Sequence, residues 1–148
     1  MVKRIAALFI ILFFVGGLAQ AQIREIPPAV KEAFENQYAK AEQVSYNDIF
    51  TSVQVRFEMN GEKYIAKYTN KGAWKETEKE WNLDKLEQEV KDGFQKSKYA
   101  EWKQTEVAVV YLPGGSEQYR IKVEKNDVVK RYLFFNKSGR LIRDAITL

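Results

Sequence analysis

The sequence predicts an α+β fold in which a unit of one helix and four strands, α-β-β-β-β, occurs twice in tandem. The first observation is a strand pattern, Ser52-Val-Gln-Val-Arg-Phe-Glu-Met, which alternates polar and apolar side chains and runs into Asn60-Gly61. The second is a copy of this pattern, Gln118-Tyr-Arg-Ile-Lys-Val-Glu, which ends at Asn126-Asp127. Such alternation before a turn pair is typical of a half-buried strand entering a tight hairpin.

Each unit begins with an amphipathic helix. In the first unit an apolar stripe formed by Val30, Ala33, Phe34 and Tyr38 follows Pro27-Pro28. Proline is favourable in the first turn of a helix. In the second unit Asn82 is a candidate N-cap for a helix with one apolar face, formed by Leu83, Leu86, Val90 and Phe94. The two helices match locally, Val30-Lys-Glu-Ala-Phe34 with Val90-Lys-Asp-Gly-Phe94, and Tyr-Ala follows each.

Four strands are expected after each helix. Those of the first unit are expected at residues 41–46, 51–59, 62–68 and 73–78, and those of the second at 106–112, 118–124, 128–135 and 140–146. Short turns between them imply an antiparallel meander sheet, and each helix must cover one sheet face. Since a single unit of about 60 residues would be marginally stable, we expect both units, 22–80 and 81–148, to join in one sheet or to pack closely.

Residues 1–21 have the features of a secretory signal peptide. Lys3 and Arg4 precede an almost wholly apolar run from Ile5 to Val15, and Ala19-Gln20-Ala21 has the form of a cleavage site. The alternative is a membrane anchor, but the apolar run through Leu18 is shorter than the ~20 residues that a span needs. We therefore expect a periplasmic or secreted protein with no membrane span after cleavage.

The composition excludes several kinds of chemistry. The chain has no Cys and no His, which removes lipid attachment at cysteine, disulfides, thiol and imidazole catalysis, and the usual zinc ligands. Of the formal charge of +4, two units belong to the expected signal peptide, and no block of like charge indicates nucleic-acid binding. No cofactor or metal is expected.

Strand alternation assigns side chains to two sheet faces. The helix-covered face is expected to hold Val53, Val55, Phe57, Met59, Ala66, Tyr68, Tyr119, Ile121, Val123, Leu133 and Phe135. The opposite face is expected to be a basic field with apolar patches, and its candidate partner-binding residues are Gln54, Arg56, Ile65, Lys67, Arg120, Lys122, Tyr132 and Phe134. It also holds Glu58, Lys63, Glu124 and Lys130. The alternative is a solvated face on which Lys and Arg stems cover the strands.

Other conspicuous residues have structural interpretations. Trp74 follows a turn glycine as Leu141 does, which favours a core position, whereas Trp81 and Trp102 are expected to pack at the junction between the units. Gly93 stands where the first helix has Ala33, which indicates close approach of helix and sheet. Pro113-Gly-Gly-Ser116 is interpreted as a hairpin turn because no helix follows to receive a phosphate. The carboxylates show no pair or calcium-loop spacing.

These features together resemble a known family. A signal peptide, no cysteine, two helix-plus-meander units, a Phe followed four or five residues later by Tyr-Ala near each helix end, and an aromatic-x3-Gly turn before each last strand look like the PepSY-like exported proteins. Their fold is similar to that of the β-lactamase inhibitor protein. The resemblance implies a binding domain with no catalysis, and a partner-binding sheet face.

Three functions follow from these observations. The first is an exported, non-enzymatic binding or inhibitory module that meets a protein or peptide partner of the cell envelope through the face opposite the helices. The second is a structural envelope protein that self-associates. The third, and most remote, is a hydrolase that uses acidic residues.

Overall fold

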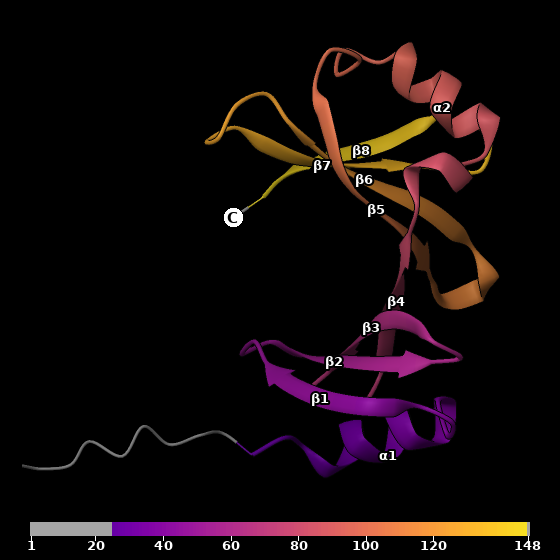
Figure 1. The fold of residues 1–148 in the computed structure, drawn as a ribbon. Helices are drawn as coiled ribbons and strands as arrows, with labels where there is room; N and C mark the ends of the chain where they lie inside the picture. Colours follow the sequence, from indigo (N-terminus) through magenta and orange to yellow (C-terminus); the bar gives the residue numbers. More distant parts are fainter. Residues whose placement is uncertain (1–24, 148) are drawn as a thin grey trace, which may run out of the picture.

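The computed structural model describes residues 25–147 and confirms the α+β fold (Figure 1). The predicted signal peptide lies outside these residues. The first unit consists of α1 (Pro28–Gln37), β1 (Glu42–Asp48), β2 (Ser52–Met59), β3 (Glu62–Thr69) and β4 (Trp74–Trp81). The second consists of a 3₁₀ turn, η1 (Leu83–Lys85), α2 (Gln88–Gln95), β5 (Lys103–Tyr111), a second 3₁₀ turn, η2 (Pro113–Gly115), β6 (Glu117–Glu124), β7 (Lys130–Phe135) and β8 (Leu141–Ile146). Within the described residues, no helix is both long and apolar enough to cross a membrane.

The eight strands form one antiparallel meander sheet in the order β1 to β8. β4 joins the two units because it pairs with strands of both. Tyr64 of β3 pairs with Lys79, and Val109 of β5 pairs with the same lysine from the other side. The choice between one sheet and two packed sheets is therefore settled in favour of one.

Each helix covers the same face of the sheet over its own half. Under α1 the buried core contains Val30, Phe34, Val53, Val55, Phe57, Ala66 and Tyr68. Under α2 it contains Leu86, Val90, Phe94, Tyr99, Val107, Val109, Tyr119, Ile121, Val123, Leu133 and Phe135. Both helices lie on the outer side of the curved sheet (Figure 1). The predicted core face is confirmed, with Met59 only partly buried.

The turns explain why the strand pattern repeats. Asn60 and Gly61 both have positive φ, 54° and 75°, as the tight type I′ hairpin turn requires. The last turn of each unit packs its glycine against the helix. A Cβ on Gly139 would lie 1.9 Å from the Glu89 carbonyl oxygen, and one on Gly72 would lie 2.5 Å from that of Ala29. The aromatic-x3-Gly pattern thus fixes how closely the sheet approaches each helix.

Gly93 lies where α2 closely approaches the sheet, as predicted, and the backbone it approaches is that of the β7–β8 turn. A Cβ at this position would lie 1.8 Å from the carbonyl oxygen of Gly139. The close approach inferred from Gly93 is therefore confirmed, although the backbone that approaches it belongs to the β7–β8 turn.

The bulges of the sheet are duplicated as well. The pairing of β3 with β4 shifts register between Lys67 and Tyr68, and that of β7 with β8 shifts between Phe134 and Phe135, so that the extra residue lies in β4 and in β8. The first strand of each unit has a register shift against the second. A bulge inserts an extra residue and so reverses the faces of the residues beyond it. In β8 this places Leu141 opposite Phe135 and Arg143 opposite Phe134.

Several expected elements differ in extent: β1 is observed at Glu42–Asp48, β5 at Lys103–Tyr111 and β7 at Lys130–Phe135, and the second helix and the fourth strand differ as well. Asn82 caps the 3₁₀ turn η1, where its side chain accepts a hydrogen bond from the Asp84 N–H at 2.9 Å. Leu86 and Glu87 are extended, so α2 begins only at Gln88. The fourth strand is longer than predicted and ends at Trp81, because its far half pairs with β5. The boundary between residues 80 and 81 stays a prediction.

The tryptophans have packing roles. Trp74 packs against the first core, as predicted, and its Nε1 donates to the Thr77 hydroxyl at 2.9 Å. Trp81 and Trp102 pack against the second core. Trp102 meets the Tyr99 ring edge-on at 5.1 Å, whereas Trp81 lies beside η1 and donates to the Lys85 carbonyl.

Tyr68 is expected to make the fold sensitive to alkali. Its side chain is fully buried and its hydroxyl donates to Gln37 at 2.8 Å. Burial, with Tyr38 and Tyr46 nearby, raises the pKa of Tyr68 above the usual value of 10.0. Because the folded state holds this proton more tightly, the stabilising effect is complete below pH 10 and is lost as pH rises toward the folded pKa.

We expect the free energy of unfolding, measured with urea at pH 9, 10 and 11, to fall above pH 10. Tyr68→Phe should be less stable at pH 9 by about 1 kcal/mol, the worth of a hydrogen bond. Between pH 10 and 11 it should lose about 1 kcal/mol less than the wild type. Parallel pH profiles for the two proteins would contradict this role of Tyr68.

Candidate partner-binding face

The face of the sheet opposite the helices, here called the open face, brings the eight predicted residues together. Across β2 and β3, Gln54 pairs with Lys67 and Arg56 pairs with Ile65. Across β6 and β7 the pairs are Arg120 with Phe134 and Lys122 with Tyr132. The strand alternation therefore places all eight on one face, four in each unit. Their role in binding a partner is a proposal.

Glu78 of β4 is the centre of this face. Its side chain is only 6% exposed; it forms an ion pair with Arg120 at 2.8 Å and accepts a hydrogen bond from Lys67 at 3.1 Å. Lys67 also binds Glu76 at 2.6 Å. Since Lys67 belongs to the first unit and Arg120 to the second, one buried carboxylate holds cations of both units. Burial lowers the pKa of Lys67, but Glu78 and Glu76 outweigh burial and the pKa is raised.

The aromatic residues of the open face are covered by arginine side chains. The Arg120 guanidinium lies 4.5 Å from the Tyr132 ring centre, and that of Arg143 lies 3.5 Å from the Phe134 ring centre. Phe134 is only 6% exposed. The apolar patches expected on this face are therefore shielded from solvent at Phe134, because stacking arginines cover apolar surface well.

The open face is nearly balanced in charge, so the expected basic field was wrong. By the register, eight cationic and seven anionic side chains share it: Arg56, Lys63, Lys67, Lys103, Arg120, Lys122, Lys130 and Arg143, with Glu42, Glu58, Glu76, Glu78, Glu80, Glu106 and Glu124. The predicted basic field was based only on the second and third strands of each unit. The glutamates of β4 and Glu106 of β5 supply most of the missing negative charge. Glu106 binds Lys122 at 2.6 Å and raises its pKa.

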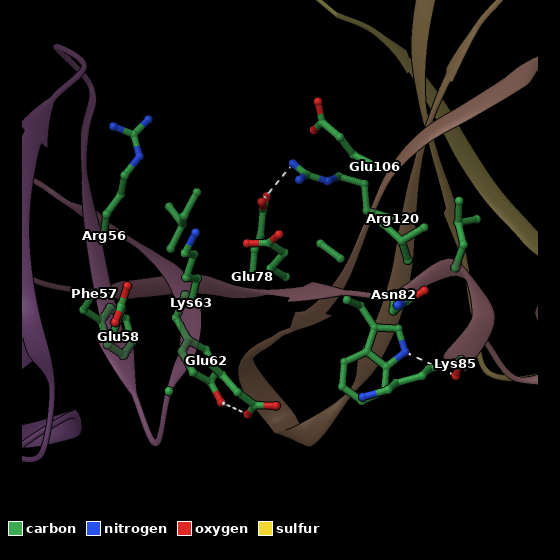
Figure 2. Close-up of a pocket in the computed structure, with 18 of the residues that line it drawn as sticks. Arg56, Phe57, Glu58, Glu62, Lys63, Glu78, Asn82, Lys85, Glu106 and Arg120 are labelled. Carbon is green, nitrogen blue, oxygen red and sulfur yellow. Dashed lines mark hydrogen bonds and ion pairs between the residues drawn. The ribbon is translucent and has the colours of Figure 1, made fainter.

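A groove of about 920 Å³ crosses the open face at the junction between the units. β2 and β3 form one side of it, β5 and β6 the other, and β4 its floor. Figure 2 shows Arg56, Glu78, Arg120 and Glu106 extending to the same side of the sheet. Trp81, Leu83 and Lys85 lie at one end of the groove. A groove of this size that both units line can hold a protruding segment of a partner protein.

Ion pairs within residues 25–147 occupy four of the eight open-face cations, Lys67, Arg120, Lys122 and Lys130, and the exposed Lys103 is one of the other four. Among residues 25–147, Arg56 and Lys63 are exposed and form no ion pair, although Glu58 stands opposite Lys63 in the register. Arg143 is exposed too, and its recorded contact is the stack on Phe134. Arg143 was absent from the predicted site because simple alternation from Leu141 assigns it to the helix face. The bulge in β8 was not visible in the sequence of that strand alone.

No grouping on the described part of the chain has the arrangement of a metal site. Groups of three or more Asp or Glu side chains that could hold a metal ion are absent from it. Glu76 and Glu78 approach one another only through Lys67, which binds both. A lysine between two carboxylates neutralises them, whereas a glycosidase needs one of the pair free to act as an acid.

The fold and the groove together define the class of protein. It is a sheet protein of two tandem α-β4 units in which, among the described residues, helices cover one sheet face and leave the other, which carries the groove, without a helix. A sequence model described as "Putative beta-lactamase-inhibitor-like, PepSY-like" matches residues 19–60 and 51–143. The chain therefore belongs to the PepSY-like family. The resemblance inferred from the aromatic and turn residues is confirmed.

Solved structures with the same fold come from several Bacteroides species. A DUF2874 family protein of Bacteroides ovatus is 27% identical with a TM-score of 0.72, covering 83% of this chain and 89% of its own. A BLIP-like protein of Bacteroides fragilis is 20% identical with a TM-score of 0.71, covering 85% and 89%. A protein of Bacteroides eggerthii described as a "putative periplasmic" protein is 22% identical with a TM-score of 0.71, covering 83% and 90%. The comparison with curated protein sequences gave no match.

Proposed function

We propose that this protein is an exported, non-enzymatic binding or inhibitory module that holds a protein partner of the cell envelope on its open face. The observation that carries the proposal is the groove of about 920 Å³ on this face, which side chains of both units line. Within residues 25–147, both helices pack on the other face. A folded sheet face with a groove and stacked Arg–aromatic pairs has the composition of protein-binding hot spots.

Export is part of the proposal. It is supported by the charged, apolar and small-residue pattern of residues 1–21 and by the description of the Bacteroides eggerthii relative as periplasmic. The name of the Bacteroides fragilis relative, BLIP-like, supports the choice of a protein as the partner. These supports are independent of the charges on the open face.

Affinity capture from envelope extract tests the proposal. Arg120 is unsuitable for a first variant because reversing its charge would also break the contact with Glu78. Lys63 is exposed and lines the groove, and Tyr132 lies under Arg120 on the same face. We expect wild-type residues 22–148 to retain a specific envelope protein and Lys63→Glu/Tyr132→Ala to retain about tenfold less, the effect of losing hot-spot contacts.

Lys71→Glu provides the charge control, because Lys71 is exposed in the turn between β3 and β4. The circular dichroism spectrum of each variant must match that of the wild type. The same captured proteins in the same amounts from the wild type and the double variant would contradict binding through the open face.

Self-association is the alternative function, and one observation favours it. β8 is an edge strand with two exposed isoleucines, Ile142 at 43% and Ile146 at 68% exposure, and an exposed edge can pair with another chain. Recovery of the protein's own chain as the captured species would favour this alternative.

A further inference from the structure

Three arginines lie on the open face, and their surroundings differ. Arg120 of β6, nearest the centre, is bound to Glu78 at 2.8 Å. Arg56 of β2 has Ser45 and Ile65 as its cross-strand neighbours, and Arg143 of β8 has Phe134. Within the described chain, neither Arg56 nor Arg143 forms an ion pair, and both are exposed. The two outer guanidinium groups are therefore available to a partner, whereas the central one is neutralised by the protein itself.

The spacing of the two outer arginines determines what size of partner could meet both. Six strand spacings separate β2 from β8. At about 4.8 Å per spacing this amounts to about 29 Å along the sheet. A small molecule cannot reach from one guanidinium to the other, whereas a protein surface can. The two arginines also belong to different units, so that contact with both needs the complete tandem fold.

The charges between the two arginines indicate the chemistry of that partner. A nucleic acid needs a continuous positive surface, since its phosphates repeat every few ångströms. Here the β4 glutamates and Glu106 lie on the same face between Arg56 and Arg143. Three of them pair with Lys67, Arg120 and Lys122, so the positive surface is interrupted between the two outer arginines and a continuous polyanion does not fit. Separate carboxylates fit, because a guanidinium binds a carboxylate through two parallel hydrogen bonds.

We propose that the open face binds an acidic protein at two separate carboxylate sites, one at Arg56 and the other at Arg143. The inference rests on the proposed function and specifies the partner's chemistry. The groove between the arginines receives the intervening part of the partner. Two anchors joined by one molecule raise its affinity well above that of either anchor alone, because the second contact forms within the complex.

Two synthetic peptides of equal length test the two-site geometry. One carries acidic residues at both ends, Glu-Glu-(Gly-Ser)14-Glu-Glu, and the other at one end only, Glu-Glu-(Gly-Ser)14-Gln-Gln. A flexible spacer of this length has an r.m.s. end-to-end distance of about 26–32 Å, which matches the distance along the sheet. In low salt we expect the wild type to bind the two-ended peptide at least about tenfold more tightly than the one-ended peptide.

Arg56→Gln and Arg143→Gln should each reduce binding of the two-ended peptide to the level of the one-ended peptide. Arg143→Lys, which keeps the charge but loses the two parallel hydrogen bonds, should retain only part of the difference. Arg140→Gln is the control, because Arg140 is an exposed arginine in the β7–β8 turn, and it should leave the difference unchanged. All affinities are measured by fluorescence anisotropy at 50 and 300 mM salt, where screening should weaken the contacts.

Equal affinity of the wild type for the two peptides, undetectable binding of both, or an equal effect of Arg140→Gln would overturn the inference. The proposed function would survive these outcomes if Lys63→Glu/Tyr132→Ala still reduced capture of the envelope protein about tenfold. Equal capture by the wild type and this double variant would instead contradict the proposed function, even where the two-ended peptide binds as expected.

Discussion

Gly139→Ala is expected to destabilise the protein by about 4 kcal/mol or more, a value reached only by severe substitutions. Two effects combine at this residue. Its φ of +77° is in the left-handed region, which costs a residue with a Cβ about 1–2 kcal/mol. In addition the new Cβ would lie 1.9 Å from the Glu89 carbonyl oxygen of α2. Because backbone cannot yield as a flexible side chain can, α2 must move away from the sheet and open the core around Val90 and Phe94.

Gly114→Ala separates the two effects. Gly114 has a φ of +83°, and no atom lies within 4 Å of the position of its Cβ. We expect this variant to lose only about 1–2 kcal/mol, the cost of the backbone conformation. Urea unfolding followed by tryptophan fluorescence measures both. Equal losses for Gly139→Ala and Gly114→Ala would show that the contact of turn and helix adds nothing to the backbone cost.

Glu78→Gln is expected to lower the free energy of unfolding by about 2–3 kcal/mol. Breaking a buried ion pair by removing one partner costs about 3–5 kcal/mol, because the other charge is left uncompensated. The side chains of Lys67 and Arg120 are 25% and 17% exposed, and Glu76 still binds Lys67, so we expect the lower end of this range or slightly less. Urea unfolding of the wild type and of Glu78→Gln at neutral pH measures this loss.

Glu106→Gln is the matched control, since it removes one carboxylate from an ion pair on the same face. Glu106 is 50% exposed where it binds Lys122, and an exposed pair contributes at most about 1 kcal/mol. A loss as small for Glu78→Gln as for Glu106→Gln would mean that Glu78 does not hold the two units together. Combination with Arg120→Gln should cost less than the sum of the single losses, because both remove the same contact.

The faces of the strands could be read from the sequence because side chains alternate strictly along a strand. Val55 and Ile121 were predicted to lie in the core, and Arg56 and Lys122 to lie opposite them; the register confirms both assignments. Asn60-Gly61 fixed one hairpin and the glycine at the last turn fixed another. These patterns depend only on residues close together in the sequence, so they can be recognised without knowing which strands are neighbours in the sheet.

The charge of the open face could not be read in the same way. Lys67 and Arg120 are apart in the sequence, and each was counted as a free cation. They meet the same carboxylate only because β4 lies between β3 and β5, and strand order is a property of the whole sheet. Arg143 was missed for a related reason, since a bulge depends on pairing with β7 and reverses the faces of β8.

The sequence by itself determined the repeated unit, the core residues and the turns, because each depends on the pattern of side chains within a few residues. The tertiary structure decided which charges remain available. It joined the two units through β4 and buried Glu78 between Lys67 and Arg120. It also placed Arg143 on the open face. Whether a surface cation is free depends on carboxylates brought near by distant pairing, and only the folded sheet specifies them.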